Sequence, residues 1–418
     1  MKNEIVSYMN QENFQYCDPP TIKDETIRSQ VDRLLIKELS IREYHNVSIF
    51  PWTEKTESFH GEVMNSDGSV VMDVNSTTIY EKYVGKTYLM SNTEEIVPEA
   101  IYLGIVSQCW GHYFTDGIAK LWCLNNPRFR ELLDRNVPIF FVAPYYDANY
   151  TTTPHAWEII MSKVGLDNKV KPLTKPTHFR KLHIADNSLF IDGSTRYYTY
   201  EFKRTVECLI ANSISQLNIP TYDKIYLSRL KLKHKSKEYG ERAIQRAFEK
   251  VGYHVVYPET LSFEEQVWLY SHAKSVVATK GSICMNSVFC QPGTELIVLR
   301  KSFGTHDYQY IVSQVRDLNV THVDSHLSVF ITELPSIGPF FLYLNDNMVR
   351  FFKDKFGKSI RNNFSRWRFF LYILFTIQKK DFVERTKAPK FYYEKMNEEL
   401  EKHPNILRVL YRKLRNIK

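Results

Sequence analysis

The stretch TKGSICMNSVFCQPGTELIVL, residues 279–299, places a turn of small residues between two apolar segments. The valine-rich segment 275–279 that leads into it predicts a buried strand, residues 282–290 predict a helix, and residues 295–300 predict a second strand. Strand, short turn, helix and strand form the repeating unit of a parallel α/β sheet. Because an anion can bind where such a turn leads into a helix, the stretch bears on function as well as on fold.

The same alternation continues in both directions along the second half of the chain. Its five predicted strands are KIYLSR (224–229), YHVVYP (253–258), SVVAT (275–279), ELIVLR (295–300) and VTHV (320–323). Strands interleaved with helices over about a hundred residues predict a doubly wound, Rossmann-like domain.

A shorter α/β pattern occupies the first half. AIYLGIVSQ (100–108) and VPIFFVAP (137–144) predict buried strands, and GHYFTDGIAKLWCLN (111–125) between them predicts a helix. Residues 43–90 alternate β-branched runs with turn residues, which predicts hairpins.

The length of the chain, 418 residues, favours two domains over a single core. We expect an N-terminal α/β domain at residues 1–180 and a Rossmann-like domain at residues 181–334. A basic, amphipathic helical tail is expected at residues 335–418.

Positive charge is concentrated near the C-terminal end. The net charge is +8, yet residues 351–418 hold 18 Lys and Arg against 7 Asp and Glu, which leaves about −3 for the rest. The slight negative charge of residues 1–350 argues against broad binding of nucleic acid, which needs a contiguous basic face. A basic amphipathic tail can lie on an anionic membrane, or its helices can pack across the domains with their charges in water. Both alternatives stay open.

The opening residues and the cysteines bear on localisation. MKNEIVSYMNQENFQY lacks the apolar core of a secretory signal, and no apolar run reaches the length of a membrane span. Six scattered cysteines form no CxxC pair and no cluster with histidine, which argues against a zinc site and a disulfide scaffold. We expect a cytoplasmic protein, with peripheral contact on the inner face of the plasma membrane as an open alternative.

Two stretches of the second half put cations where a parallel sheet binds ligands, at the carboxyl ends of its strands. Arg229 ends the strand IYLSR, and Lys280 and Gly281 precede a predicted helix start. Gly281 allows close approach of the backbone, and Ser282 can cap the helix or offer its hydroxyl to a phosphate. The alternatives are a solvated basic loop and an ordinary turn.

Two carboxylates in YPETLSFEEQ have different explanations. Glu259 follows a strand end, where acidic residues of dinucleotide folds accept hydrogen bonds from ribose hydroxyls. Glu265 lies three residues after Ser262, which predicts a structural capping box.

The stretch GHYFTDGIAKLW carries an imidazole and a carboxylate one turn apart, at His112 and Asp116. Such a pair can share a proton, and either member can serve as a general base. The alternative is a carboxylate that complements the helix dipole beside a surface histidine. The apolar stripe on the other side of the predicted helix is formed by Phe114, Ile118, Leu121 and Trp122.

Several strong motifs are absent from the chain: it has no P-loop, no GxGxxG, no HExxH, no GxSxG and no Asp-x-Asp pair. No carboxylate pair therefore marks a metal-bound diphosphate, and we predict neither a metal nor a cofactor. A departing diphosphate would need protein cations and a helix end to stabilise it.

These segments resemble glycosyltransferase family 61. The likeness rests on WGHYFTDGIAKLW, IYLSR and GYHVVYPETLSFEEQVWLYSHAKSVVATKGSICMNSVFCQPGTELIVL, within residues 100–300. The family includes bacterial capsular and exopolysaccharide enzymes, the branch expected here, and eukaryotic xylosyl- and N-acetylglucosaminyltransferases. Its pattern has a histidine before the glycine of the last motif, where this chain has Lys280.

The resemblance implies a GT-B architecture, with two Rossmann-like domains facing a cleft, and metal-independent transfer with inversion. It implies a nucleoside-diphosphate sugar as donor, in particular a UDP-sugar, and a glycan or lipid-linked saccharide as acceptor in capsule or exopolysaccharide synthesis. The implied site consists of Arg229, Lys280, Gly281 and Ser282 at the diphosphate, Asn286 as a brace, Glu259 at the nucleoside, and His112 and Asp116 on the acceptor side, in the N-terminal domain.

Two other functions remain open on the sequence. A nucleotide-sugar epimerase or hydrolase of the same fold would turn over the donor without an acceptor. A non-enzymatic protein would instead bind a partner through its basic tail.

Overall fold

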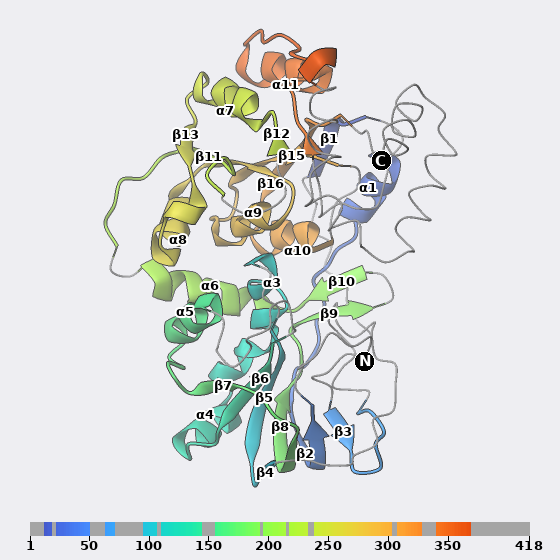
Figure 1. The fold of residues 1–418 in the computed structure, drawn as a ribbon, viewed down its shortest axis with the longest axis vertical. Helices are drawn as coiled ribbons and strands as arrows, with labels where there is room; N and C mark the ends of the chain where they lie inside the picture. Colours follow the sequence, from blue (N-terminus) through green and yellow to red (C-terminus); the bar gives the residue numbers. More distant parts are fainter. Residues whose placement is uncertain are drawn as a thin grey trace, which may run out of the picture.

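The computed structural model describes residues 12–18, 22–50, 63–71, 95–106, 110–143, 155–192, 195–214, 217–232, 238–302, 307–327 and 340–368. Two sheets lie one above the other along the long axis of the molecule, with helices between them (Figure 1). The mixed α/β class with parallel strands is as predicted.

The upper sheet has six strands in the order β1-β16-β15-β14-β11-β13, and every neighbouring pair is parallel. All five strands predicted in the second half of the chain belong to it. Their apolar runs are buried because parallel strands with helices on both faces have no solvent side. The strands are β1 (Glu12–Tyr16), β11 (Lys224–Leu227), β13 (His254–Val256), β14 (Ser275–Thr279), β15 (Glu295–Arg300) and β16 (Asn319–Asp324).

Helices surround this sheet, and a short strand pair lies beside it. α8 begins at the predicted capping box, in which Ser262 and Glu265 bond each other's backbone N–H groups. The short pair consists of β12 (Glu238–Tyr239) and β17 (Phe340–Phe341), which are parallel. The helices are α1 (Ile22–Ser29), α7 (Glu241–Glu249), α8 (Phe263–His272), α9 (Ser282–Met285), α10 (Asp307–Val315) and α11 (Asp346–Phe356), with 3-10 helices η3 (Pro258–Thr260) and η4 (Asn286–Phe289).

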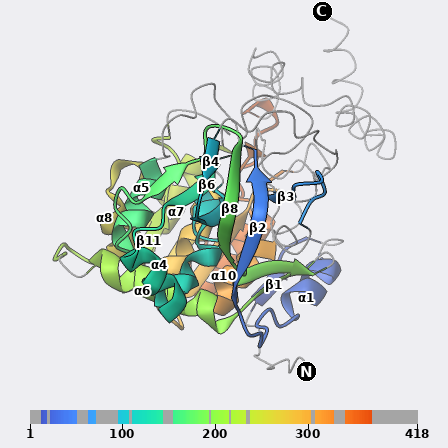
Figure 2. The same cartoon turned by 90° about the horizontal axis from the view of Figure 1, so that it is seen from below.

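The lower sheet has the order β3-β2-β8-β5-β6-β7, with β4 also paired to β8. β2 and β8 lie side by side across it as an antiparallel pair (Figure 2). Its strands are β2 (Ile41–Ile49), β3 (Val63–Asn65), β4 (Glu95–Val97), β5 (Ala100–Ile105), β6 (Ile139–Val142), β7 (Val170–Pro172) and β8 (Thr177–Ala185). Outside this sheet, the same part of the chain forms a separate hairpin of β9 (Leu189–Asp192) and β10 (Thr195–Tyr198). It also forms the helices α3 (Trp110–Tyr113), η2 (Gly117–Asn125), α4 (Pro127–Asp134), α5 (His155–Lys163) and α6 (Tyr200–Ile214).

The helix predicted at residues 111–125 is broken, so that prediction was wrong in detail. A single α-helical turn, α3, is followed by a turn and then by the 3-10 helix η2. Gly117 lies at the break, where an added Cβ would be 3.3 Å from both the His112 carbonyl oxygen and the Trp157 ring. A side chain at this position would therefore meet α5, which carries Trp157. The predicted stripe from Phe114 to Trp122 is nevertheless buried.

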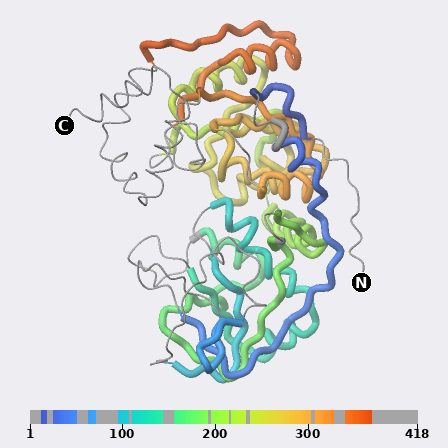
Figure 3. The backbone as a smooth tube through the Cα atoms, turned by 90° about the vertical axis from the view of Figure 1, so that its right-hand side faces the viewer, coloured from blue at the N-terminus to red at the C-terminus, as the bar shows by residue number. Residues whose placement is uncertain are grey.

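The two sheets divide the chain at other places than the expected limits at residues 180 and 334. β1 adds an edge strand to the upper sheet beside β16, and the chain then runs along the outside of the molecule to the lower sheet (Figure 3). β8 crosses residue 180 within the lower sheet.

Part of the expected tail belongs to the fold. α11 buries Met348, Phe351 and Phe352 in the apolar cluster of the upper half, the part of the molecule built on the upper sheet. The apolar face of α11 is therefore already covered. Residues 369–418 of the tail lie outside the described residues.

One apolar core joins the two halves. Phe114 of the lower half stacks on Phe263 of α8 with ring centroids 5.8 Å apart, and meets Phe289 of η4 edge-on at 4.8 Å. This contact holds α3 and its side chains against the helices of the upper sheet.

Candidate active site

The predicted pair His112 and Asp116 lies where the two halves meet. Nδ1 of His112 is 2.6 Å from Oδ2 of Asp116, so the predicted contact is confirmed. The His112 side chain is 20% exposed and that of Asp116 only 1%. The imidazole therefore reaches solvent while the carboxylate is enclosed behind it. Asp116 also stands at the N-cap position of η2, where the alternative reading places a carboxylate.

Tyr308, at the start of α10, supplies a partner that the sequence did not reveal. Its hydroxyl donates to Asp116, lying 2.5 Å from Oδ1 and 2.7 Å from Oδ2. Its ring meets the His112 ring edge-on, with centroids 5.3 Å apart. Burial, and then the charge of Asp116, raise the pKa of the Tyr308 hydroxyl well above its ordinary value, so it remains a donor.

Arg196 of β10 fixes the other side of the Tyr308 ring. Its guanidinium lies 4.4 Å from the ring centroid and 3.7 Å from Asp307. A second buried cation, Arg33, lies 3.6 Å from the same Asp307 carboxylate. These ion pairs fix the start of α10, and with it the hydroxyl that contacts Asp116.

The turn at Gly281 and Ser282 lies next to this pair. A Cβ added to Gly111 of α3 would be 3.1 Å from Met285 Cγ and 3.5 Å from Ser282 Cα. The residue before His112 is therefore in close contact with the start of α9. The structure brings together the two predicted halves of the site, the acid–base pair and the turn.

Asn286 connects the same elements. Its side-chain oxygen accepts a hydrogen bond from Trp110 Nε1 at 2.7 Å, and its amide donates to the Tyr270 hydroxyl at 3.1 Å. Fully buried, it holds α3 to α8 across the boundary between the halves.

Arg229 is joined by Lys301, which the sequence did not single out. Arg229 Nε lies 3.1 Å from Oε1 of Glu238, and Lys301 Nζ lies 2.8 Å from the same oxygen. A Cβ added to Gly281 would lie 3.5 Å from Lys301 Nζ. Two cations and the glycine of the turn thus gather at the carboxyl ends of β11, β14 and β15.

A second buried carboxylate holds the backbone after β11. Glu241 Oε1 accepts the Arg229 backbone N–H at 2.9 Å. Burial is the main cause that raises the pKa of Glu241 to about 7. This hydrogen bond sets the position from which the Arg229 side chain leaves the strand end.

Lys280 is buried and lies in a basic neighbourhood. Its ammonium donates to the Ser302 hydroxyl at 3.2 Å. Burial, and next the charge of Arg300, lower the pKa of Lys280 to about 7.

Glu259 follows a different strand of the upper sheet from the groups described above. It is exposed in η3, directly after β13, which is the edge strand of the upper sheet next to β11. Such a position suits contact with a ligand lying along the strand ends.

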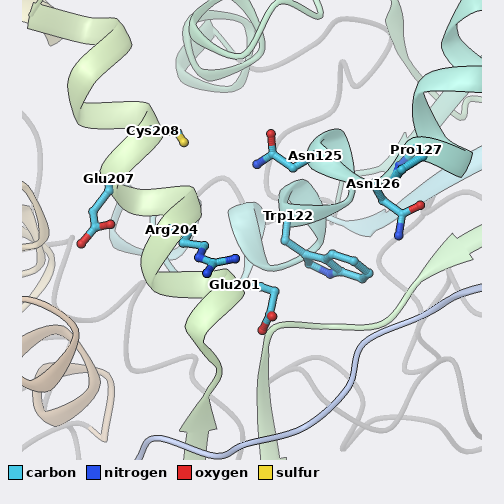
Figure 4. A pocket seen from close by; sticks show the side chains of 8 residues that line it. All are labelled: Trp122, Asn125, Asn126, Pro127, Glu201, Arg204, Glu207 and Cys208. Carbon is cyan, nitrogen blue, oxygen red and sulfur yellow. The ribbon is translucent and has the colours of Figure 1, made fainter.

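The described residues also contain a pocket away from the predicted site. It has a volume of about 450 Å³ and lies between η2, the start of α4, and α6 (Figure 4). None of the predicted site residues lines it. Its lining residues are Trp122, Asn125, Asn126, Pro127, Glu201, Arg204, Glu207 and Cys208.

The described part of the chain has neither a cluster of metal-binding side chains nor a membrane-spanning helix. No three His, Cys, Asp or Glu side chains in it gather as they would around a metal ion. No helix in it has the length and apolar character needed to cross a membrane.

A parallel α/β sheet with cations at its strand ends, and an imidazole–carboxylate pair beside them, is an arrangement suited to group transfer from an anionic donor. Residues 110–297 match the model of the family described as Glycosyltransferase 61. The chain is thus a glycosyltransferase, and this class implies a nucleotide-sugar donor and a glycan acceptor. No curated protein matches the chain.

The matched segment contains every predicted site residue, from His112 to Asn286, and also Glu238. Lys301 and Tyr308 follow its end. Only their contacts in the fold place these two side chains at the site.

Proposed function

We propose that the chain is an inverting, metal-independent glycosyltransferase with a GT-B arrangement. The upper half holds a nucleoside-diphosphate sugar, in particular a UDP-sugar, and the lower half presents a glycan or lipid-linked saccharide of capsule or exopolysaccharide synthesis. The observation that carries this proposal is the contact between α3, which bears His112, and the start of α9 beside Lys301 and Arg229.

His112 is the proposed general base, and Asp116 positions it. Both oxygens of Asp116 already accept hydrogen bonds from Tyr308, and the carboxylate is enclosed. The imidazole has the exposed edge, so Nε2 takes the proton from the acceptor hydroxyl while Asp116 stabilises the imidazolium.

The transfer is a single displacement. The deprotonated acceptor oxygen attacks the anomeric carbon as the bond to the diphosphate breaks on the opposite face, which inverts the configuration. Negative charge then grows on the departing diphosphate, and Arg229, with Lys280 and the amides at Gly281 and Ser282, stabilises it. Glu259 is proposed to contact the nucleoside, and Asn286 to brace the turn.

We propose a cytoplasmic location, with peripheral membrane contact through residues beyond 368. The basic character of residues 351–418 supports this contact, because a lipid-linked acceptor would lie at a membrane surface. The packing of α11 in the upper half restricts the proposal to the segment that follows it.

The test is the thermal stabilisation of the full chain by UDP, GDP, CDP and CMP, each with and without EDTA. We expect a shift with one nucleoside diphosphate that EDTA leaves unchanged and that Arg229→Ala removes. No shift with any of the four, or a shift abolished by EDTA, would contradict the proposed donor site.

A further inference from the structure

Cations from two separate strand ends share one carboxylate oxygen. Oε1 of Glu238 lies 2.8 Å from Lys301 Nζ and 3.1 Å from Arg229 Nε. The three side chains are 3%, 5% and 14% exposed for Glu238, Lys301 and Arg229. An anionic oxygen therefore lies between two enclosed cations, directly beside the proposed diphosphate turn.

The cluster attracts an anion of higher charge than one carboxylate. Arg229 and Lys301 carry two positive charges, Glu238 contacts both of them, and Glu241, whose pKa is raised to about 7, accepts the Arg229 backbone N–H. Burial is the main cause that lowers the pKa of Lys301, because the enclosed ammonium loses its contact with water. The charge of Glu238 makes up for only part of that loss. Lys280 and Arg300 are further cationic groups near the same strand ends, and Arg300 is paired with Asp324 at 3.4 Å.

Gly281 leaves its backbone open toward Lys301. With a φ of 123°, this residue is in a region that favours glycine. Among the described residues, the only atoms within 4 Å of a Cβ added there belong to Lys301, with Nζ at 3.5 Å. The ammonium and the bare backbone of the turn thus face the same space.

Lys301 has a second support that does not depend on Glu238. Its ammonium lies 4.4 Å from the centroid of the Phe340 ring in β17. β12, which carries Glu238, pairs with β17, and Gly240 behind it packs so closely on the Leu342 carbonyl that an added Cβ would lie 1.9 Å from that oxygen. The backbone that carries Glu238 is therefore held by β17, and a movement of its carboxylate away from the cations would be a movement of the side chain.

We propose that Lys301 and Arg229 together bind the terminal phosphate of the donor's diphosphate, and that Glu238 is the counter-ion that holds these cations until the phosphate replaces it. This inference rests on the proposed function and adds Lys301 and Glu238 to its donor site. The two phosphates of the donor carry one negative charge each, and the terminal phosphate gains a second when its bond to the sugar breaks, so the group binds two cations more strongly than a single carboxylate does. Arg contributes several donors to its oxygens. The exchange leaves both cations with an anionic partner before and after the donor binds.

The test measures the dissociation constant of UDP, and of GDP and CDP in parallel, for the wild type, Lys301→Met, Glu238→Gln and the double variant. We expect Lys301→Met to weaken binding about tenfold or more, because it removes a charged hydrogen-bond donor. Glu238→Gln should tighten binding about fivefold, because the phosphate no longer competes with a carboxylate. The double variant should bind more weakly than Glu238→Gln alone.

Lys274→Met is the matched control, because Lys274 is a surface lysine of the same half whose side chain is 78% exposed. Its affinity should equal that of the wild type. Melting temperatures without ligand show whether each variant is folded, and the double variant avoids leaving Glu238 without its lysine.

Two results would overturn the inference while leaving the proposed function in place. One is wild-type affinity in folded Lys301→Met; the other is weakened binding in folded Glu238→Gln, which would make Glu238 a positioning group and not a competitor. Absence of nucleoside-diphosphate binding by the wild type would instead overturn the proposed function, and the inference with it.

Discussion

At the scale of single residues, the site combines an enclosed carboxylate with an imidazole that reaches solvent. The spacing of His112 and Asp116 in the sequence was enough to predict their contact, because residues four apart lie together on one turn. The same spacing gave no information on which member is enclosed. That depends on Tyr308 and Arg196, which distant segments bring to the pair.

The donor cations were predicted only in part for a similar reason. Arg229 and Gly281 follow strand ends, and a parallel sheet places such ends along one edge. Lys301 also follows a strand, β15, but its role emerges only from contact with Glu238 and the space beside Gly281. No local pattern in the sequence encodes that convergence.

Lys280 gives a pH-dependence at the residue scale. Its pKa is lowered to about 7, so the side chain is cationic below that pH and loses its proton as the pH rises through it. The protein's attraction for a diphosphate should therefore fall over this range. We expect the UDP affinity of the wild type, relative to that of Lys280→Arg, to decrease about five- to tenfold between pH 6.5 and 8.5.

Binding titrations of both proteins over that range give the measurement. UDP itself gains negative charge as the pH rises, and the Lys280→Arg protein experiences the same change, so the ratio of the two affinities isolates Lys280. A ratio that stays constant from pH 6.5 to 8.5 would contradict the expected loss of the Lys280 charge at the donor site over this range.

At the scale of elements, the upper sheet was the easiest part to predict. Its strands are short apolar runs bounded by turn residues, and helix signals between them are strong, as at the capping box of Ser262 and Glu265. β1 was missed because it is a short strand of mixed pattern whose partner, β16, is far away in the sequence. The break before η2 was missed because the close contact of Gly117 with Trp157 joins segments that are distant in the sequence, which a local pattern does not show.

The capping box of α8 provides a stability prediction. Ser262→Ala removes the acceptor for the Glu265 backbone N–H and should cost about 1 kcal/mol of unfolding free energy. For a domain of this size we expect the melting temperature to fall by roughly 2–4 °C. Differential scanning calorimetry makes the measurement.

Thr260→Ala is the control, because its exposed hydroxyl donates only to the Tyr257 carbonyl within η3. It should leave the melting temperature nearly unchanged. Equal effects of the two substitutions would mean that the box does not stabilise the start of α8.

At the scale of the whole molecule, the site is assembled from both halves. The shared core at Phe114, Phe263 and Phe289 and the bond between Trp110 and Asn286 hold α3 against the upper half. Tyr308 reaches across the same boundary to Asp116. The position of the acid–base pair therefore depends on how the halves pack, which explains why residues outside the matched family segment complete it.

Tyr308→Phe tests this dependence. The change removes both hydrogen bonds to Asp116, keeps the ring beside His112, and should lower kcat about tenfold with little change in UDP affinity. Steady-state kinetics and UDP titration of the variant provide both quantities.

Tyr310→Phe is the matched control, since Tyr310 lies on the same helix, is buried, and bonds to Glu25 instead. Its kcat should stay near that of the wild type. If both variants show the same kcat, the hydroxyl of Tyr308 does not act on the pair.

In the proposed reaction His112, held by Asp116, takes the acceptor proton while the donor binds elsewhere in the site. The most direct measurement is the rate of sugar transfer by His112→Gln, taken together with its UDP dissociation constant. We expect transfer to fall at least about 100-fold, as loss of a general base does, while the dissociation constant stays within about twofold of the wild type. Transfer at half the wild-type rate, or loss of UDP binding in a folded variant, would contradict it.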